Sequence, residues 1–208
     1  MKTFDERAKD WDADPAKVER ARVVADAMRA TGLLKSGMTA LEYGCGTGLL
    51  SFALQQDFAS ITLADTSQGM LEVLADKIKG AAVNNMQPLL VDMNFQPVPA
   101  ARFDVIYSLL TLHHIPDTEA ALRHFNMLLK PGGLLCIADL EEEDGSFHGI
   151  SVTDVHKGFK RETLKKQLET SGFTDVRFSS VFSVVKQVEA VEKAFPVFLL
   201  AARNSHTA

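Results

Sequence analysis

The chain is poor in cysteine and in aromatic residues other than phenylalanine. Its 208 residues include two cysteines, one tryptophan and two tyrosines. Cys45 and Cys136 are too few for a disulfide framework, and neither belongs to a CxxC pattern of the kind that binds metal or exchanges disulfides. The charged N-terminal residues MKTFDERAKDWDAD contain no apolar stretch like that of a signal peptide. We therefore expect a reduced, cytoplasmic protein.

A surplus of positive charge and long apolar runs are also missing. The 22 Lys and Arg residues against 27 Asp and Glu give a formal charge of −5, so no field gathers a polyanion and we expect no nucleic-acid partner. The apolar runs are far shorter than the roughly 20 residues of a membrane helix, so we expect no membrane partner either. The sequence favours no particular oligomeric state.

The composition that is present is that of a globular protein. Hydrophobic residues make up 46% of the chain and charged residues 24%. The length fits one domain of the usual size, so we expect residues 1–208 to fold as a single unit. Helical spacing begins at residues 15–31, with Asp14 as the expected cap, Pro15 in the first turn and Gly32 at the end.

From residue 38 onward, short apolar strands alternate with amphipathic helices. The expected strands lie at residues 39–43, 61–64, 88–91, 103–108 and 134–138, and the expected helices at 47–57, 67–79 and 117–130. This alternation predicts an α/β fold with a doubly wound, mostly parallel sheet covered on both faces. A further helix at 161–171 precedes two β-rich runs, at 174–185 and 195–203. Because their connection is short, the second run is expected to enter the sheet antiparallel.

The segment LEYGCGTG, residues 41–48, combines a strand end with three alternating glycines. Glycines at such a turn let a ligand approach the backbone, since no Cβ stands in the way. Three acidic residues follow the ends of successive strands: Glu42 before the glycines, Asp65 about twenty residues later, and Asp92 in VDMNF beside Met93. A carboxylate after the second strand suits the hydroxyls of a ribose, and one after the third suits an adenine amine.

Two other interpretations of this pattern are weaker. Each acid could merely cap the next helix, but that explains three acids together with the glycines poorly. A nicotinamide dinucleotide would require GxGxxG, and the third glycine would then fall at position 49, which is Leu49.

With these motifs, the chain resembles the class I S-adenosylmethionine-dependent methyltransferases over residues 38–203. LEYGCGTG, LADTSQGML, LLVDM, FDVIYSLLTLHHIPD and LKPGGLLCIADLE occur in the family's order. The resemblance implies a seven-stranded sheet of order 3-2-1-4-5-7-6 with strand 7 antiparallel. It also implies S-adenosyl-L-methionine as cofactor, bound by Glu42, Gly44, Cys45, Gly46, Gly48, Asp65, Thr66, Met70, Asp92, Met93 and Ser108, with Trp11 from a covering arm.

The segment after the fourth strand lacks the signatures of several methyltransferase classes. It has no tetrad of the amino-methylating nucleic-acid enzymes, and Ser108 and Leu109 stand where metal-dependent catechol-type enzymes place an Asp. The prediction is a metal-independent enzyme that moves the methyl group to a small molecule. A cofactor-binding protein without catalysis, and a methyltransferase acting on protein or RNA, are the alternatives.

Two segments are expected to surround the acceptor: an N-terminal arm and helix at 1–35, with Phe4 and Trp11 in contact, and a loop at 141–160. Candidate catalytic residues are four histidines, each of which could instead be structural or solvated: His113, His114, His148 and His156. We expect no metal, although Asp139, Glu141, His148 and His156 include suitable ligand types. The acidic run 141–144 is expected to be a solvated loop, with selection of a cationic acceptor as the alternative.

Overall fold

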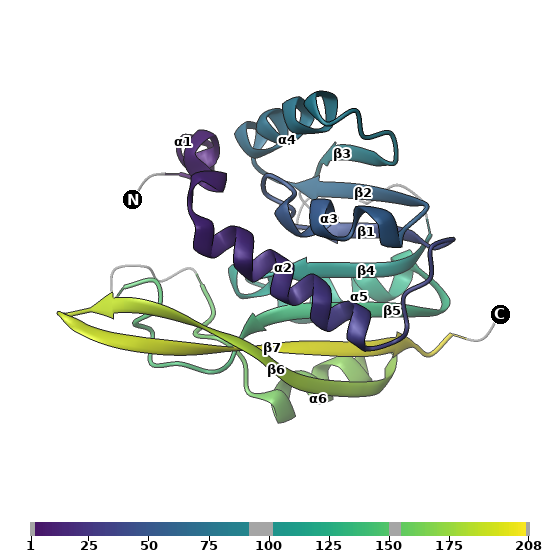
Figure 1. The fold of residues 1–208 in the computed structure, drawn as a ribbon. Helices are drawn as coiled ribbons and strands as arrows, with labels where there is room; N and C mark the ends of the chain where they lie inside the picture. Colours follow the sequence, from purple (N-terminus) through teal and green to yellow (C-terminus); the bar gives the residue numbers. More distant parts are fainter. Residues whose placement is uncertain (1–2, 92–101, 150–154, 207–208) are drawn as a thin grey trace.

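The computed structural model describes residues 3–91, 102–149 and 155–206, and its centre is one seven-stranded sheet (Figure 1). Its order is β3-β2-β1-β4-β5-β7-β6, with β7 antiparallel to both neighbours. The order and direction of the strands confirm the prediction. The strands are β1 (Thr39–Tyr43), β2 (Ser60–Asp65), β3 (Met86–Leu90), β4 (Phe103–Leu109), β5 (Leu129–Leu140), β6 (Phe173–Val188) and β7 (Val191–Asn204).

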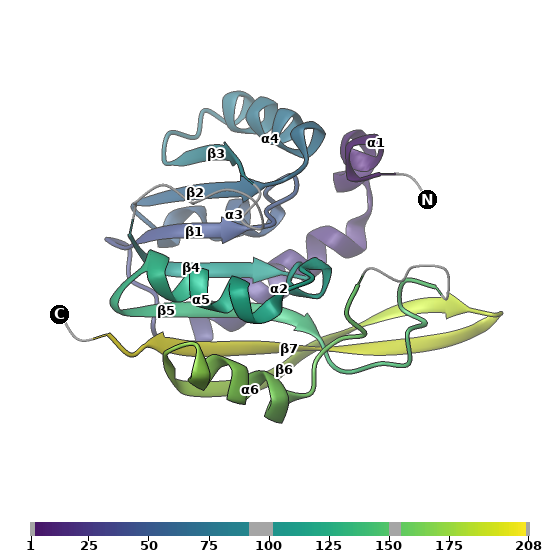
Figure 2. The ribbon, with the colours of Figure 1, turned by 180° about the vertical axis from the view of Figure 1, so that it is seen from behind.

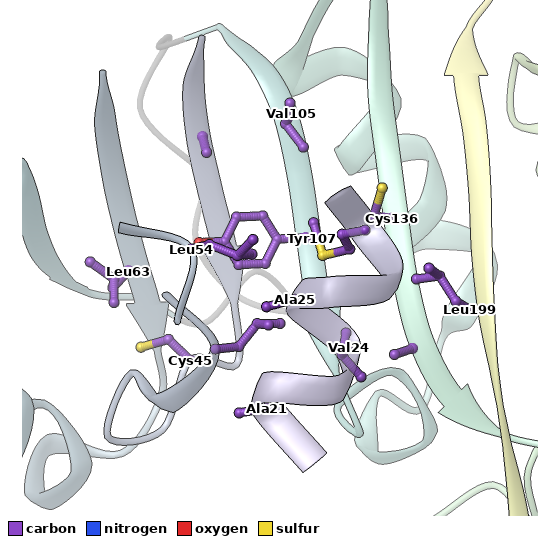
Figure 3. Packing of buried hydrophobic residues seen from close by; sticks show 14 of the residues in the cluster. Ala21, Val24, Ala25, Cys45, Leu54, Leu63, Val105, Tyr107, Cys136 and Leu199 are labelled. Carbon is purple, nitrogen blue, oxygen red and sulfur yellow. The ribbon is translucent and has the colours of Figure 1, made fainter. Parts of the chain in front are cut away.

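Helices cover both faces of the sheet, as its apolar strands require. The helices α2, α3 and α4 lie on one face, and α5 and α6 on the other (Figures 1 and 2). Each face has its own hydrophobic cluster; Figure 3 shows Val24 and Ala25 of α2 near Tyr107 and Cys136 of the sheet. The helices are α1 (Phe4–Arg7), α2 (Pro15–Ala30), α3 (Leu49–Ala53), α4 (Gln68–Gly80), α5 (Thr118–Leu128) and α6 (Arg161–Thr170), with short 3₁₀ turns η1 (Ala8–Ala13), η2 (Gln55–Asp57) and η3 (Leu112–His114).

The helix starts follow the capping signals in the sequence. Asp14 accepts a hydrogen bond from the Ala16 backbone N at 3.0 Å, and Ser67 accepts one from Met70 N at 3.2 Å. These bonds satisfy backbone donors that have no partner within the first helical turn. The helix expected at 47–57 is instead the short α3 followed by η2. It begins only at Leu49 because its N-cap, Gly48, is in the left-handed region with φ of 79°. None of the helices formed by the described residues is long and apolar enough to cross a membrane.

The last two strands form a hairpin that is longer than the sequence predicted. It extends beyond the rest of the sheet (Figure 2). The two-residue turn between Val188 and Val191 consists of Glu189 and Ala190, whose φ angles are 48° and 67°. Positive φ at both central residues is the geometry that matches the twist of paired strands. The outer part of the hairpin is therefore available to support the loop that follows β5.

Candidate active site

The glycine loop between β1 and α3 lies at the carboxyl ends of the parallel strands, where ligands of doubly wound sheets bind. Gly44 and Gly48 are glycines for packing reasons. A Cβ on Gly44 would stand 2.2 Å from Thr111 Cγ2, and one on Gly48 would stand 2.6 Å from a Leu74 methyl. Both have positive φ. These two positions fix the loop against its neighbours.

Gly46 is different because a Cβ there would overlap no neighbouring atom. A Cβ there would find only Met70 Sδ and Trp11 Nε1 within 4 Å, both at 3.9 Å. The structure thus brings together three predicted cofactor residues that are distant in sequence, around backbone that a ligand can approach. Cys45, between the glycines, directs its thiol into the hydrophobic core, where burial raises its pKa well above the usual value. Only the backbone of Cys45 remains a candidate for ligand contact.

Asp65 ends β2 and faces the glycine loop. Its carboxylate accepts hydrogen bonds from Gly46 N at 2.7 Å and from Ser67 N at 2.8 Å. Burial raises its pKa in spite of these bonds. Thr66 beside it is exposed. The carboxylate is therefore held at the strand end next to Gly46, where the resemblance places a ribose-binding acid.

Glu42 is buried behind the glycine loop. Its carboxyl accepts hydrogen bonds from the backbone N of Ser51, at 3.2 Å, and from the Ser51 hydroxyl. That hydroxyl also lies 2.6 Å from Tyr107 Oη. Burial raises the pKa of Glu42 to about 8. The residue thus ties β1 to α3, and direct contact with a cofactor amine stays a prediction.

The end of β4 supplies a polar group that lacks a partner. The Ser108 hydroxyl is buried and has no hydrogen-bond partner among the described residues. Buried polar groups are nearly always satisfied, so such a group calls for an explanation, of which a ligand is one. The predicted adenine residues Asp92 and Met93 lie outside the described residues.

The N-terminal arm is fastened to the glycine loop and to α4. Asp5 accepts hydrogen bonds from Ser67 Oγ at 2.5 Å and from Gly69 N at 2.9 Å, which lower its pKa. Asp12 contacts Thr47 Oγ1 at 2.5 Å and Lys77 Nζ at 2.6 Å. These contacts hold Trp11 beside Gly46. The sequence predicted the arm through Phe4 and Trp11 and missed the two aspartates that fasten it.

Three of the four candidate histidines meet in one cluster. The ring centroids of His113 and His114 are 4.2 Å apart, and that of His148 lies 5.1 Å and 5.0 Å from them. His113 Nδ1 lies 2.6 Å from Asp139 Oδ1 at the end of β5. Burial lowers the pKa of His114 to about 3, with a further contribution from His113 and His148. Burial also lowers the pKa of His148 to about 4, with further contributions from His113 and Lys186. His114 and His148 are therefore neutral at pH 7.

His156 lies apart from this cluster and braces the chain. Its Nε2 lies 3.0 Å and 3.2 Å from the carbonyl oxygens of Ile115 and Pro116, and its backbone N donates to the His113 carbonyl at 2.8 Å. Glu141 pairs with Arg161 instead of facing His148. The metal set of Asp139, Glu141, His148 and His156 is therefore not assembled, because Asp139, Glu141 and His156 have other partners.

The acidic run at 141–144 is neutralised by neighbouring side chains. Glu142 pairs with Lys160 at 3.4 Å and Asp144 with Lys193 at 2.5 Å. The carboxylate of Glu143 accepts hydrogen bonds from two backbone N–H groups of the loop. These carboxylates shape the loop, which leaves the idea of selection for a cationic acceptor without support.

The long hairpin supports the loop that carries His148. Lys186 of β6 donates to the Phe147 carbonyl at 2.8 Å, and its Nζ lies 3.5 Å from the centroid of the Phe147 ring. Phe147 packs edge-on against His148 and Phe195. Sequence reasoning missed Phe147 and Lys186. The one available signal was the short gap between the two β-rich runs, which permits a hairpin long enough to reach the loop.

The family comparison agrees with this architecture. A family model described as "Methyltransferase domain" matches residues 17–177. A ubiquinone biosynthesis O-methyltransferase of Marinobacter nauticus is 32% identical over 114 residues, which cover 54% of this chain and 48% of that protein. The chain spans about half the length of the curated relatives it matches.

Solved structures share the fold at low sequence identity. The YcgJ protein of Bacillus subtilis has a TM-score of 0.75 at 13% identity, covering 88% of this chain and 99% of that chain. Phosphoethanolamine N-methyltransferase 2 of Haemonchus contortus, solved in complex with S-adenosyl-L-methionine, has a TM-score of 0.67 at 17% identity, covering 83% of this chain and 50% of that one. With the family model covering most of the sequence and the strand order matching, the chain belongs to the methyltransferase domain family of class I fold, whose cofactor is S-adenosylmethionine.

Proposed function

We propose that this chain is an S-adenosylmethionine-dependent methyltransferase with a small-molecule acceptor. The observation that carries the proposal is the meeting of Gly46, Trp11 and Met70 at the carboxyl ends of the strands, where a Cβ on Gly46 would overlap no atom. The unpartnered Ser108 hydroxyl supports a polar ligand nearby. In this proposal the glycine loop and Glu42 hold the methionine moiety, Asp65 the ribose hydroxyls, and Thr66, Met70 and Trp11 the adenosine, together with Asp92 and Met93.

When bound, S-adenosylmethionine supplies a methyl group attached to a sulfonium sulfur, and the sulfur leaves as a neutral thioether. What remains for the protein is to align the acceptor with the methyl carbon and to exclude water. The N-terminal arm excludes water, because Asp5 and Asp12 hold it across the glycine loop. The histidine cluster lies beside the arm, with the Phe4 ring 5.6 Å from that of His114. We assign this side to the acceptor.

A small acceptor fits the segments that remain. We assign to the acceptor the part of the arm that meets the histidine cluster at Phe4, together with the described part of the loop at 141–160. In the described part of the loop, Glu142 and Asp144 pair with lysines, which favours a small acceptor over a highly charged macromolecule. We extend the proposal to a cytoplasmic location, since Cys45 and Cys136 are both free and buried.

Calorimetry tests the cofactor site first. Wild-type protein is titrated with S-adenosylmethionine and with its demethylated product, beside Asp65→Ala and the control Asp76→Ala, an exposed acid on α4. We expect binding by wild type and control and at least 10-fold weaker binding by Asp65→Ala. Absence of binding by wild type, or equal binding by Asp65→Ala, would refute the site.

Catalysis needs a separate assay. Turnover is measured against phenols, thiols, amines and small acids, with formation of the demethylated product as the readout. Methylation of at least one class is expected. Cofactor binding without turnover on any of them would favour a binding protein without catalysis.

A further inference from the structure

The histidine cluster has the composition of a metal site. The ligand atoms of His113, His114 and His148 all lie within 4.8 Å of one another. In the same cluster, the Nε2 atoms of His113 and His148 are buried without a hydrogen-bond partner among the described residues. His113 is only 1% exposed. Leaving two imidazole nitrogens desolvated and unpaired is unfavourable unless another group takes their lone pairs.

Asp139 determines which nitrogen of His113 faces the cluster. Its carboxylate lies 2.6 Å from His113 Nδ1 and also accepts from Leu140 N at 2.7 Å. An ionised carboxylate only accepts hydrogen bonds, so Nδ1 carries the proton and Nε2 presents its lone pair. A histidine ligand whose other nitrogen donates to a carboxylate is the usual outer-sphere arrangement of protein metal sites.

We propose that His113, His114 and His148 bind one divalent transition-metal ion of the Zn²⁺ type, whose open coordination position takes the methyl acceptor. Three imidazoles suit Zn²⁺ and its first-row neighbours, whereas Mg²⁺ and Ca²⁺ require oxygen ligands. Three protein ligands with one position left open are typical of catalytic rather than structural zinc. The sequence alone favoured a metal-independent enzyme, because it did not bring these three side chains together.

The position of the cluster connects it to methyl transfer. Thr111, two residues before His113, donates to the Gly44 carbonyl at 3.3 Å. The Phe4 ring lies between His114 and Trp11, and the centroids of the Phe4 and Trp11 rings are 6.0 Å apart. Trp11 in turn lies at Gly46. The cluster is thus a neighbour of the cofactor loop.

The acceptor class follows from this position, and this part rests on the proposed function. A hydroxyl or thiol bound to the ion loses its proton to solvent more readily. The resulting anion forms a bond to the methyl carbon while the carbon–sulfur bond breaks, and the bonding pair stays on the departing thioether. The geometry therefore points to hydroxyl or thiol compounds as acceptors.

Metal binding is tested with untagged, full-length protein that has been treated with chelator and dialysed. Zn²⁺ is titrated calorimetrically, and Co²⁺ serves as a spectroscopic probe of the coordination geometry. The variants are His148→Ala, in a loop outside the sheet, and Asp139→Asn, with His124→Ala on α5 as the matched control. Titration of each variant with S-adenosylmethionine monitors the fold and the cofactor site independently.

We expect one ion per wild-type chain, at least 10-fold weaker binding by His148→Ala, 10- to 100-fold weaker binding by Asp139→Asn, and wild-type affinity in His124→Ala. Substoichiometric metal in wild type, or unchanged affinity in His148→Ala, would overturn the metal site even if S-adenosylmethionine binds normally. Metal binding without cofactor binding would instead refute the proposed function and leave the metal site standing.

Discussion

Replacing the buried carboxyl of Glu42 by an amide should change how the stability of the protein depends on pH. Burial raises the pKa of Glu42 to about 8 from the usual 4.5. Below pH 4.5 the carboxyl holds its proton in both the folded and the unfolded chain, so its contribution to stability is fully present. As the pH rises toward 8, only the folded chain keeps the proton, and the contribution is lost.

The magnitude follows from the two pKa values. Each pH unit in this window removes about 1.4 kcal/mol from the free energy of unfolding, which sums to about 5 kcal/mol above pH 8. Glu42→Gln carries no titrating group and can still accept from Ser51 N and donate to Ser51 Oγ. The difference in unfolding free energy between Glu42→Gln and wild type should therefore grow by about 4 kcal/mol between pH 5 and pH 9.

The assay is denaturant unfolding of the ligand-free proteins at a series of pH values, with m-values compared at each pH. Glu162→Gln, an exposed acid in the first turn of α6, serves as the control. The control should run parallel to wild type over the whole range. A Glu42→Gln curve that also runs parallel to wild type would refute the reasoning, since Glu42 would then have the same pKa in both states.

Four further substitutions test packing, ligand contact and backbone strain. Gly44→Ala should lower the free energy of unfolding by about 3 kcal/mol or more, because the new Cβ overlaps Thr111. Gly46→Ala should lower it by only about 1–2 kcal/mol, the cost of the positive φ, and should weaken S-adenosylmethionine binding at least 10-fold. Equal losses of stability in urea unfolding would contradict that contrast. Ser108→Ala should stabilise the ligand-free protein by about 1 kcal/mol, since it removes a buried unpartnered hydroxyl. In calorimetry the same variant should bind the cofactor more weakly. A less stable variant would mean that the hydroxyl is satisfied in the ligand-free protein. Ala190→Gly should raise the urea midpoint through a gain of about 0.5–1 kcal/mol, because φ is 67° there, and an unchanged or lower midpoint would show that the turn relaxes.

The position of the glycine loop beside the acid at the end of β2 was predictable from the sequence because its determinants are local. The strand, the glycines and Asp65 follow one another along a regular alternation of strands and helices, and each position carries a residue type that the backbone or the ligand requires. Even the antiparallel last strand followed from a short connection. Asp5 and Asp12 escaped prediction because their partners, Ser67 and Lys77, lie more than sixty residues away.

The histidine cluster was only partly predictable, because its determinants are not local. The four histidines were recognised as candidates, but their grouping depends on contacts that no local pattern encodes. His148 lies beside His113 because Lys186 of the hairpin holds the neighbouring loop residue Phe147. His156 lies outside the cluster because its ring nitrogen contacts two backbone carbonyl groups. A periodicity argument assigns residues to elements and cannot pair one loop with the far end of a hairpin.

One strained residue links the two halves of the site. Leu110 follows β4 with a φ of 51°, a conformation that costs a non-glycine residue about 1–2 kcal/mol, and it donates from its backbone N to the Ala138 carbonyl at 2.8 Å. This turn directs Thr111 to Gly44 and lets His113 reach Asp139. Strain of this kind persists where the surrounding structure over-determines it, and such positions concentrate at functional sites. The end of β4 therefore fixes the glycine loop and the histidine cluster relative to each other, as the proposed transfer between a bound donor and a bound acceptor would require.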